Sequence, residues 1–162
     1  MNPALAAVIV YSLVVPQANA SSARLVSGPG FEGAIMTAEA LRSSEPHGQR
    51  SFTQLWTPTE AQVREAEALL PEYLASSAAA VVVRGSRIAT ELAQYRRQYW
   101  GVVRDGNREL LISFFHVKTS VGARGLWQTT VIAVQGGGDQ YFRVSYGVES
   151  RRFSRLQVNA PE

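Results

Sequence analysis

Residues 95–117 read YRRQYWGVVRDGNRELLISFFHV, and this stretch decides the fold. Two apolar and aromatic segments flank the dipeptide Asp105-Gly106. This dipeptide favours a tight type I′ turn, because both central residues of that turn need a positive φ. The stretch therefore predicts a β-hairpin, which we expect to be the central pair of strands in a sheet.

The first strand of the hairpin begins with an unusual run of Tyr, Arg, Gln and Trp at residues 95–101. Side chains alternate between the faces of a strand, so residues 95, 97 and 99 share one face and residues 96, 98 and 100 share the other. One interpretation is structural, with rings packed on a helix and arginine stems covering the sheet. The other is a binding surface, since these residue types are enriched at interface hot spots. The candidate binding residues are Tyr95, Arg96, Arg97, Tyr99, Trp100, His116, Arg124 and Trp127.

Further strands are expected after the hairpin. Residues 127–135 are rich in β-branched residues, residues 141–146 alternate cleanly, and residues 153–158 favour a last short strand. The glycines at 136–138 resemble a phosphate-binding loop only superficially, because a strand follows them and no Lys is present. We interpret them as a hairpin turn.

The clearest helix start is Thr57-Pro58-Thr59-Glu60. Thr57 can cap the helix, Pro58 suits the first helical position, and Glu60 completes a capping box. Apolar residues then recur at three-to-four spacing, which predicts an amphipathic helix over residues 58–75. Pro71 predicts a kink or an early end.

Two regions carry weaker patterns. Residues 21–52 are rich in Ser, Gly and Pro, and they predict an extended, partly flexible segment in which residues 31–41 form a short strand or a turn of helix. Residues 76–80 look like a connector, and residues 81–83 favour a short strand. Helical spacing at residues 88–95 favours a short helix before the hairpin.

Together these elements predict a single α+β domain at residues 53–162. One long amphipathic helix would pack on a curled four- to five-stranded antiparallel sheet, since this buries the apolar faces of both. The length of 162 residues fits one domain with a real core. The sequence does not say which face of the sheet the helix covers.

The first twenty residues have the pattern of a signal peptide. Residues 4–15 form a short apolar run, Pro16 ends it, and Ala18-Asn19-Ala20 matches the small-x-small cleavage pattern, although no Lys or Arg precedes the run. We therefore expect a signal peptide at residues 1–20, a mature chain from Ser21, and a secreted or periplasmic location. No later apolar run is long enough for a membrane span.

Several chemistries lack the residues that they need. The chain has no Cys, which excludes disulfides, thiolate metal sites and a catalytic thiol. It has no Gly-x-Ser-x-Gly motif, and its histidines, His47 and His116, lie in unrelated contexts. The only aspartates, Asp105 and Asp139, adjoin turn glycines. We predict no cofactor, no metal and no catalytic residues.

The formal net charge of +3 gives a weak preference for acidic partners. The basic residues are fifteen Arg and one Lys, and they are scattered along the chain. This scatter argues against nucleic acid as the partner. The partner is expected to be a protein or a small ligand, and the oligomeric state is open.

The chain resembles a loose group of small exported bacterial proteins without assigned activity. The shared-looking elements are Trp56-x-Pro58, Tyr95-x-Arg97-Gln98-Tyr99-x-Gly101, Val134-x-Gly136-Gly137 with Tyr141-Phe142, and Val158-Asn159. The resemblance brings no catalytic residues. In architecture the expected helix and sheet are similar to cystatin-like and NTF2-like folds, although the Gln-x-Val-x-Gly hairpin of inhibitory cystatins is missing.

Three functions remain open on the sequence. The leading hypothesis is a non-enzymatic exported domain that binds its partner through one sheet face. The second is a small-molecule pocket or an enzyme of cystatin-like or NTF2-like fold that uses His116. The third is an inhibitor or immunity-type partner of another exported protein.

Overall fold

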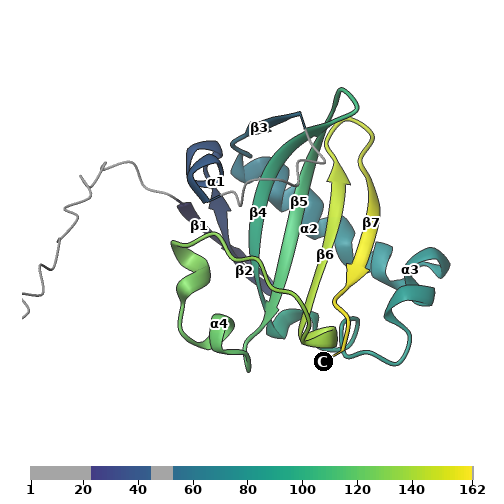
Figure 1. Ribbon diagram of the computed structural model, residues 1–162. Coiled ribbons are helices and arrows are strands. Elements are labelled where there is room, and N and C mark those ends of the chain that lie inside the picture. The colour runs from purple at the N-terminus through teal and green to yellow at the C-terminus, as the bar shows by residue number, and fades with distance from the viewer. Residues whose placement is uncertain (1–22, 45–52, 162) are drawn as a thin grey trace, which may run out of the picture.

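The predicted hairpin lies at the centre of the sheet (Figure 1). Strands β4 (Tyr95–Arg104) and β5 (Asn107–His116) pair antiparallel along their full length. The turn residues have φ of 50° at Asp105 and 76° at Gly106, as a type I′ turn requires. The structure is a computed structural model that describes residues 23–44 and 53–161.

The α+β class is confirmed, but the sheet is larger than predicted and is mixed. It has seven strands in the order β1-β2-β4-β5-β6-β7, and β3 also pairs with β4. Strand β2 runs parallel to β4, whereas the other pairs are antiparallel. The remaining strands are β1 (Ala23–Gly28), β2 (Phe31–Met36), β3 (Gln54–Trp56), β6 (Tyr141–Gly147) and β7 (Arg152–Val158).

The N-terminal residues contribute two strands and a helix, and the short strand expected within residues 31–41 is β2. Strands β1 and β2 are followed by α1 (Ala38–Ser44). Gly33 permits the parallel pairing, because a Cβ there would lie 2.5 Å from the Tyr99 ring. The expected signal peptide, residues 45–52 and His47 lie outside the described residues.

The long helix forms, but it begins two residues later than predicted. In α2 (Glu60–Ala75) the N-cap is Thr59, whose Oγ1 accepts from the Gln62 backbone N–H, while Gln62 Oε1 accepts from the Thr59 N–H at 2.9 Å. Thr57 lies before the helix, and its Oγ1 accepts from the Ala38 N–H at 3.0 Å, at the start of α1. The helix continues through Pro71.

The predicted strand at residues 81–83 is wrong, because these residues end the helix that follows α2, α3 (Ser77–Val83). The side chain of Ser76 caps it by accepting from the Ala79 N–H. The preceding alanines favour helix over strand. The expected short helix before the hairpin is only a 3-10 turn, η1 (Leu92–Gln94).

The predicted strand at residues 127–135 is also absent. Helix α4 (Ser120–Ala123) and a 3-10 turn, η2 (Leu126–Gln128), lead into an irregular segment that ends at η3 (Gly138–Gln140). Gln98, which is fully buried, holds this segment in place of a strand ladder. Its side chain donates to the carbonyls of Trp127 (2.7 Å) and Thr130 (2.6 Å) and accepts from the Ile132 N–H (3.1 Å).

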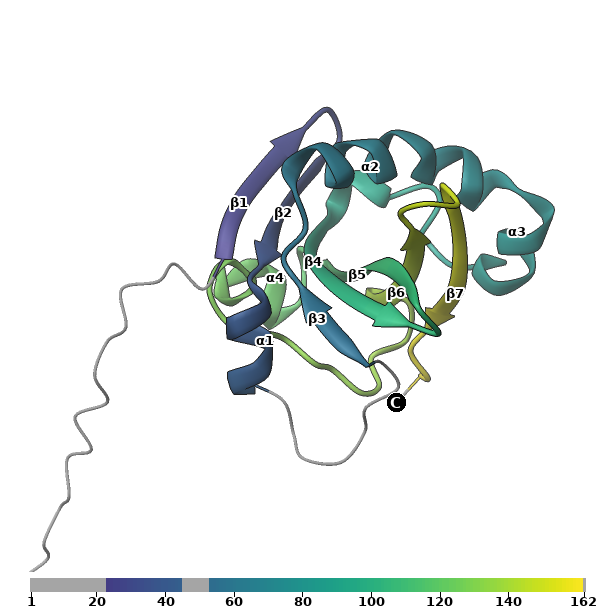
Figure 2. The ribbon, with the colours of Figure 1, turned by 90° about the horizontal axis from the view of Figure 1, so that it is seen from above.

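Different helices pack on the two faces of the curled sheet. Figure 2 shows α2 along one side, with α1 and α4 on the other. The larger core lies under α2 and includes Tyr95, Tyr99, Phe114 and Phe142. A smaller cluster around Phe115 and Trp127 lies on the opposite face. Helix α2 therefore covers the face that carries residues 95, 97 and 99.

Candidate functional site

A buried ionic cluster lies between α2 and the sheet. Arg97 Nε donates to Glu67 Oε1 at 3.1 Å, and the Tyr99 hydroxyl donates to the same oxygen at 2.8 Å. The Arg97 side chain is 1% exposed and that of Glu67 is 5% exposed. The guanidinium also donates to the backbone carbonyl of Tyr95 and lies 5.4 Å from the centre of the Phe114 ring. These contacts leave Arg97 no access to a partner.

Burial shifts the pKa values of both acidic groups in this cluster. Burial raises the pKa of Glu67 above its ordinary value, although the Arg97 charge opposes the shift. Burial, and then the Glu67 charge, raise the pKa of Tyr99 well above its usual range. Tyr99 is therefore a neutral donor at any ordinary pH.

The raised pKa of Glu67 predicts a pH-dependent stability. The unfolded carboxyl titrates near 4.5, so its contribution to stability is complete below that pH and is lost as the pH rises through the higher folded-state pKa. We expect the free energy of unfolding of the wild type to fall relative to that of Glu67→Gln as the pH rises above 4.5. Urea denaturation of both proteins across this range measures the difference. A difference that is constant with pH would contradict the expectation.

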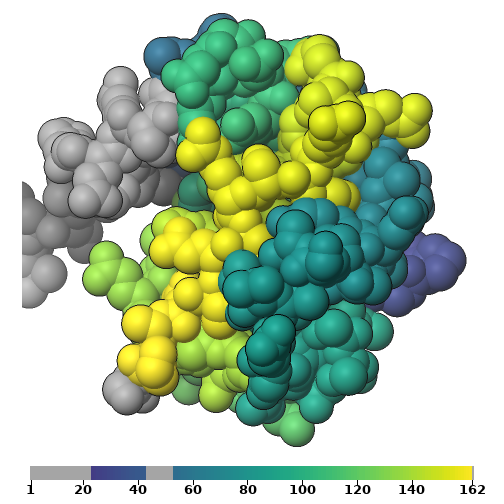
Figure 3. All heavy atoms as spheres, turned by 90° about the vertical axis from the view of Figure 1, so that its right-hand side faces the viewer, coloured from purple at the N-terminus to yellow at the C-terminus, as the bar shows by residue number. Residues whose placement is uncertain are grey.

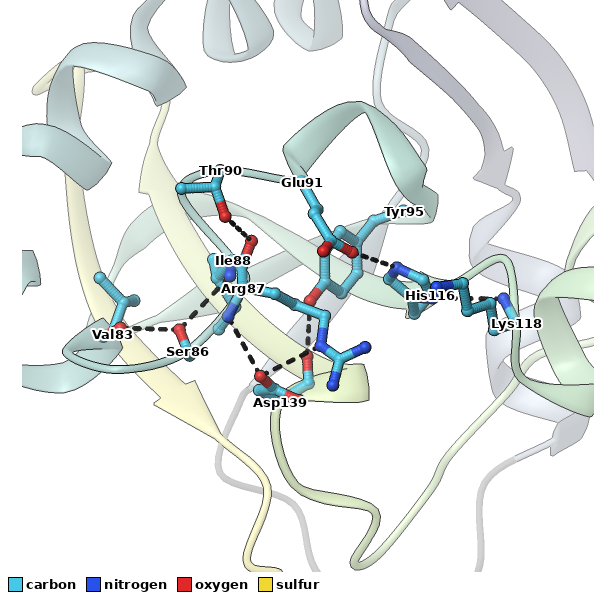
Figure 4. A network of polar contacts seen from close by, with 10 residues as sticks. All are labelled: Val83, Ser86, Arg87, Ile88, Thr90, Glu91, Tyr95, His116, Lys118 and Asp139. Atoms are coloured by element: carbon cyan, nitrogen blue, oxygen red, sulfur yellow. Dashed lines mark hydrogen bonds and ion pairs between the residues drawn. The ribbon is translucent and has the colours of Figure 1, made fainter.

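His116, the last residue of β5, belongs to a second polar network (Figure 4). Its Nδ1 accepts from the Lys118 backbone N–H at 3.2 Å, so Nε2 carries the hydrogen that is donated to Glu91 Oε2 at 3.0 Å. The imidazole is 1% exposed and meets the Tyr95 ring edge-on at 5.0 Å between centres. Both ring nitrogens are engaged, so neither is free to act on a ligand in this arrangement.

Asp139 and Arg87 complete this network. Asp139 Oδ2 accepts from the backbone N–H of Arg87 at 3.1 Å and from its Nε at 3.3 Å, and the Tyr95 hydroxyl donates to the Asp139 carbonyl at 2.6 Å. Burial alone would raise the pKa of Asp139, but the hydrogen bonds and charge of Arg87 together lower it. The network fixes the segment before β4 to the segment before β6.

The candidate residues from the sequence are distributed over both faces. Five are buried: Tyr95, Arg97, Tyr99, His116 and Trp127. Arg96 and Trp100 are partly exposed, and Arg124 is exposed. The structure brings Arg96 to 5.9 Å from the centre of the Trp127 ring and pairs it with Glu32 at 2.7 Å. Only Arg96, Trp100 and Arg124 keep the surface access that a binding role needs.

Sequence reasoning missed a basic surface on the C-terminal hairpin, β6–β7. Residues 141–158 contain four Arg and one Glu, so they carry a formal charge of +3, as much as the whole chain. We call Arg143, Arg151, Arg152 and Arg155 the arginine surface; all four are exposed. Figure 3 shows this hairpin, in yellow, beside α3. The doublet at residues 151–152 was the available signal, and the pairing of β6 with β7 places all four arginines on one hairpin at the edge of the sheet.

The arginines of this surface differ in their partners. Arg151 pairs with Glu65 at 2.6 Å, and Arg155 lies 3.8 Å from Glu109. Arg143 donates to Gln157 Oε1. Among the described residues, no ion pair involves Arg152. Exposed ion pairs contribute little to stability, so a partner can replace them at small cost.

Two hollows flank Arg152 and Phe153. The first measures about 350 Å³ and lies against α2, where Tyr73 stacks on Phe153 at 4.9 Å between ring centres. The second measures about 430 Å³, lies at the hairpin ends, and includes Glu109 and Gly147. The arginine surface thus lies beside the guanidinium of Arg152, which has no ion pair, the stacked rings of Tyr73 and Phe153, and two hollows. Exposed arginines and aromatic side chains next to a pocket are features of residues that anchor an interface.

Other kinds of site receive no support from the described residues. In residues 23–44 and 53–161, no three His, Asp or Glu side chains are grouped so that they could hold a metal ion. Across the same residues, no single helix has the length and apolarity to span a membrane, and only α2 and α3 together, bent by 78°, meet those criteria.

Comparison with known proteins gives no relative. The chain matches no protein-family model, and no curated protein or solved structure is detectably similar to it. The resemblance to small exported bacterial proteins therefore stays a prediction. What the residues and the geometry establish is an α+β protein with a mixed seven-stranded sheet and a basic C-terminal hairpin.

Proposed function

We propose that this protein is a non-enzymatic binding domain that docks a carboxylate-bearing protein on the arginine surface. The observation that carries the proposal is the formal charge of +3 on residues 141–158, gathered on one edge of the sheet. Complementary charge steers association and favours one partner over others. The apolar run at residues 4–15 supports export of the chain, with maturation at Ser21.

The neighbours of the arginines favour a protein over nucleic acid. Glu65 and Glu109 lie against Arg151 and Arg155, and Glu149 accepts from Arg108 at 2.7 Å. A phosphate backbone would meet these carboxylates as well as the arginines and would be repelled by them. A protein surface with charges of both signs can satisfy both.

The edge of β7 favours recognition through side chains. Arg155 has a φ of 55°, and the register of β6 with β7 shifts between Arg143 and Ser145. Such irregularities disrupt the regular backbone edge that an added strand would need. The arginine side chains, rather than the backbone, are therefore the groups that a partner would contact.

The test uses the mature chain as bait in the exported fraction, followed by binding measurements with the purified, identified partner. We expect Arg151→Glu/Arg152→Glu to weaken binding by at least about tenfold, because like charges then face each other. The matched control is Arg24→Glu/Arg42→Glu, which reverses two exposed arginines on β1 and α1. Equal affinity of the two double variants would overturn the proposal.

The alternatives relate to this proposal in different ways. An inhibitor or immunity-type role is a special case, in which the partner is another exported protein. A cystatin-like or NTF2-like pocket around His116 has less support, because that imidazole is buried and both its nitrogens are engaged. The aromatic side chains Tyr95, Phe114 and Phe142 pack the space between the sheet and α2.

A further inference from the structure

Strand β1 forms an outer edge of the sheet and presents backbone groups that have no strand beside them (Figure 2). It comes first in the strand order, and β2 is its only partner among the described residues. A two-residue turn joins β1 to β2, so the closing pair, Gly28 and Phe31, exchanges backbone hydrogen bonds. Because these bonds alternate along an antiparallel pair, the N–H and C=O groups of Leu25 and Ser27 point away from β2.

The features that protect an edge strand are present on β7 and missing from β1. At β7, the other end of the strand order, α3 packs on the strand, Arg155 has a φ of 55°, and the register with β6 shifts. In β1 the six residues keep one register with β2, none has a positive φ, and Arg24 is the only charged residue. A regular edge of this kind is a template for a strand of another chain.

Two exposed leucines lie on one side of the β1 edge. Leu25 is 55% exposed and Leu126 is 48% exposed. Leu25 lies opposite Ala34, which belongs to the smaller cluster with Trp127, so Leu25 points to the face on which that cluster lies. Leu126 lies on the same face, because it begins η2, which contacts β1. A strand with an apolar residue opposite Leu25 would remove this apolar surface from water.

We propose that β1 pairs antiparallel with β1 of a second copy of this chain, about a twofold axis at Leu25. The two Leu25 residues then exchange backbone hydrogen bonds, and their side chains meet beside Leu126 of each copy. Arg24 lies opposite Val26 of the second copy, so like charges do not face each other. A register centred on Arg24 would oppose two arginines, and one centred on Val26 would place Leu25 opposite Ser27.

The structure favours a second copy over the other possible occupants of this edge. The irregular β7 cannot accept β1 of a further copy, so the pairing closes at two chains and does not extend into a fibre. In the mature chain expected from Ser21, only Ser21 and Ser22 precede β1, which is too short a segment to fold back along it. The edge is also complementary to itself, because its exposed apolar residue meets the same residue.

The pairing has a consequence for the arginine surface. Two seven-stranded sheets joined at β1 place the two β6–β7 hairpins at opposite outer ends. The dimer would therefore present the arginine surface twice, and a partner with two acidic sites would bind it with added avidity. The pairing itself does not rest on the proposed function. Its test measures the oligomeric state without any partner, so either proposal can fail without the other.

The test is sedimentation velocity of the mature chain over a series of concentrations. We expect a monomer–dimer equilibrium with a dissociation constant of about 1–100 µM, because one short strand pair buries less surface than a standard interface. Amide hydrogen exchange at Leu25 and Ser27 should slow as the concentration rises. A monomer at every concentration up to about 1 mM would overturn the proposal, and so would a dimer that forms only when residues 1–20 are retained.

Two variants test the strand pairing itself. Leu25→Lys places like charges opposite each other and should raise the dissociation constant at least about tenfold. Ser27→Pro removes an N–H that faces the second copy and not β2, so it should have a similar effect through the backbone alone. Val81→Lys changes a residue of α3 that is 72% exposed, and Arg24→Glu/Arg42→Glu reverses charges that meet no like charge; both controls should dimerise as the wild type does. Wild-type dimerisation of either Leu25→Lys or Ser27→Pro would contradict the proposal.

Discussion

Replacing Arg97 by Met is expected to lower the free energy of unfolding by about 3–5 kcal/mol, because it leaves the Glu67 carboxylate buried without its cation. Met nearly matches the Arg stem in volume, so the loss reports the ionic contact more than packing. The guanidinium also satisfies backbone carbonyls of Tyr95, Leu92 and Gly30, which would lose a donor. Urea denaturation at neutral pH measures the effect.

Two further variants make this result specific. Arg96→Met removes the neighbouring, partly exposed arginine from the opposite face and should cost less than about 1 kcal/mol. Glu67→Leu/Arg97→Met removes both charges and should recover much of the stability lost in the single variant. Equal losses for Arg96→Met and Arg97→Met would show that α2 does not cover the face assigned to it.

Phe114→Ala is expected to lower the free energy of unfolding by about 3–5 kcal/mol, since it opens a cavity at the centre of the main core. The Phe114 ring stacks on Phe142 at 4.0 Å between centres and 7° between planes. It also meets the Tyr95 ring edge-on and lies under the Arg97 guanidinium. Truncation therefore removes contacts to three neighbouring strand residues at once.

Leu111→Ala is the matched control for this variant. Leu111 lies on the same strand, β5, but on the opposite face, and it is only partly buried. Chemical denaturation should give a loss below about 2 kcal/mol for this variant, because less apolar surface becomes uncovered. A loss as large as that of Phe114→Ala would mean that both faces are covered equally well.

The sequence was sufficient where the structure depends on local chemistry. The Asp105-Gly106 turn fixes the register of β4 with β5, and the alternation at residues 141–146 marks the inward face of β6. Turn residues and period-two patterns involve only a few neighbouring positions, so they can be recognised in a single sequence. The helix start was displaced by two residues: Thr57 and Thr59 both precede suitable partners, and in the structure Thr59 with Gln62 forms the capping box, while Thr57 Oγ1 accepts from the distant Ala38 N–H.

The sequence was insufficient where pairing is distant. Strand β2 joins β4 in parallel across some sixty residues, and no local pattern encodes such a contact. The β-branched residues at 127–135 are held irregular by Gln98, a polar side chain buried from another strand. Such tertiary contacts override the intrinsic preference for strand.

The candidate site, like the fold, could be predicted from the sequence only where it depends on local patterns. The composition at residues 95–101 drew attention to side chains that mostly serve the core, and burial could not be assigned until the covering face was known. The arginine surface is spread over β6, the turn and β7, so its charge gathers only in the folded sheet. A cluster of side chains that strand pairing brings together is separated in the sequence, so it cannot be recognised there as a continuous run.

The salt dependence of partner binding tests the central claim most directly. The dissociation constant of the identified partner is measured at low and at physiological ionic strength for the wild type and for Arg151→Glu/Arg152→Glu. Exposed charges are screened by salt, so the wild type should lose affinity as salt is raised, whereas the variant should bind weakly and respond little. Identical dissociation constants and identical salt responses for the two proteins would contradict the claim that the arginine surface is the docking site.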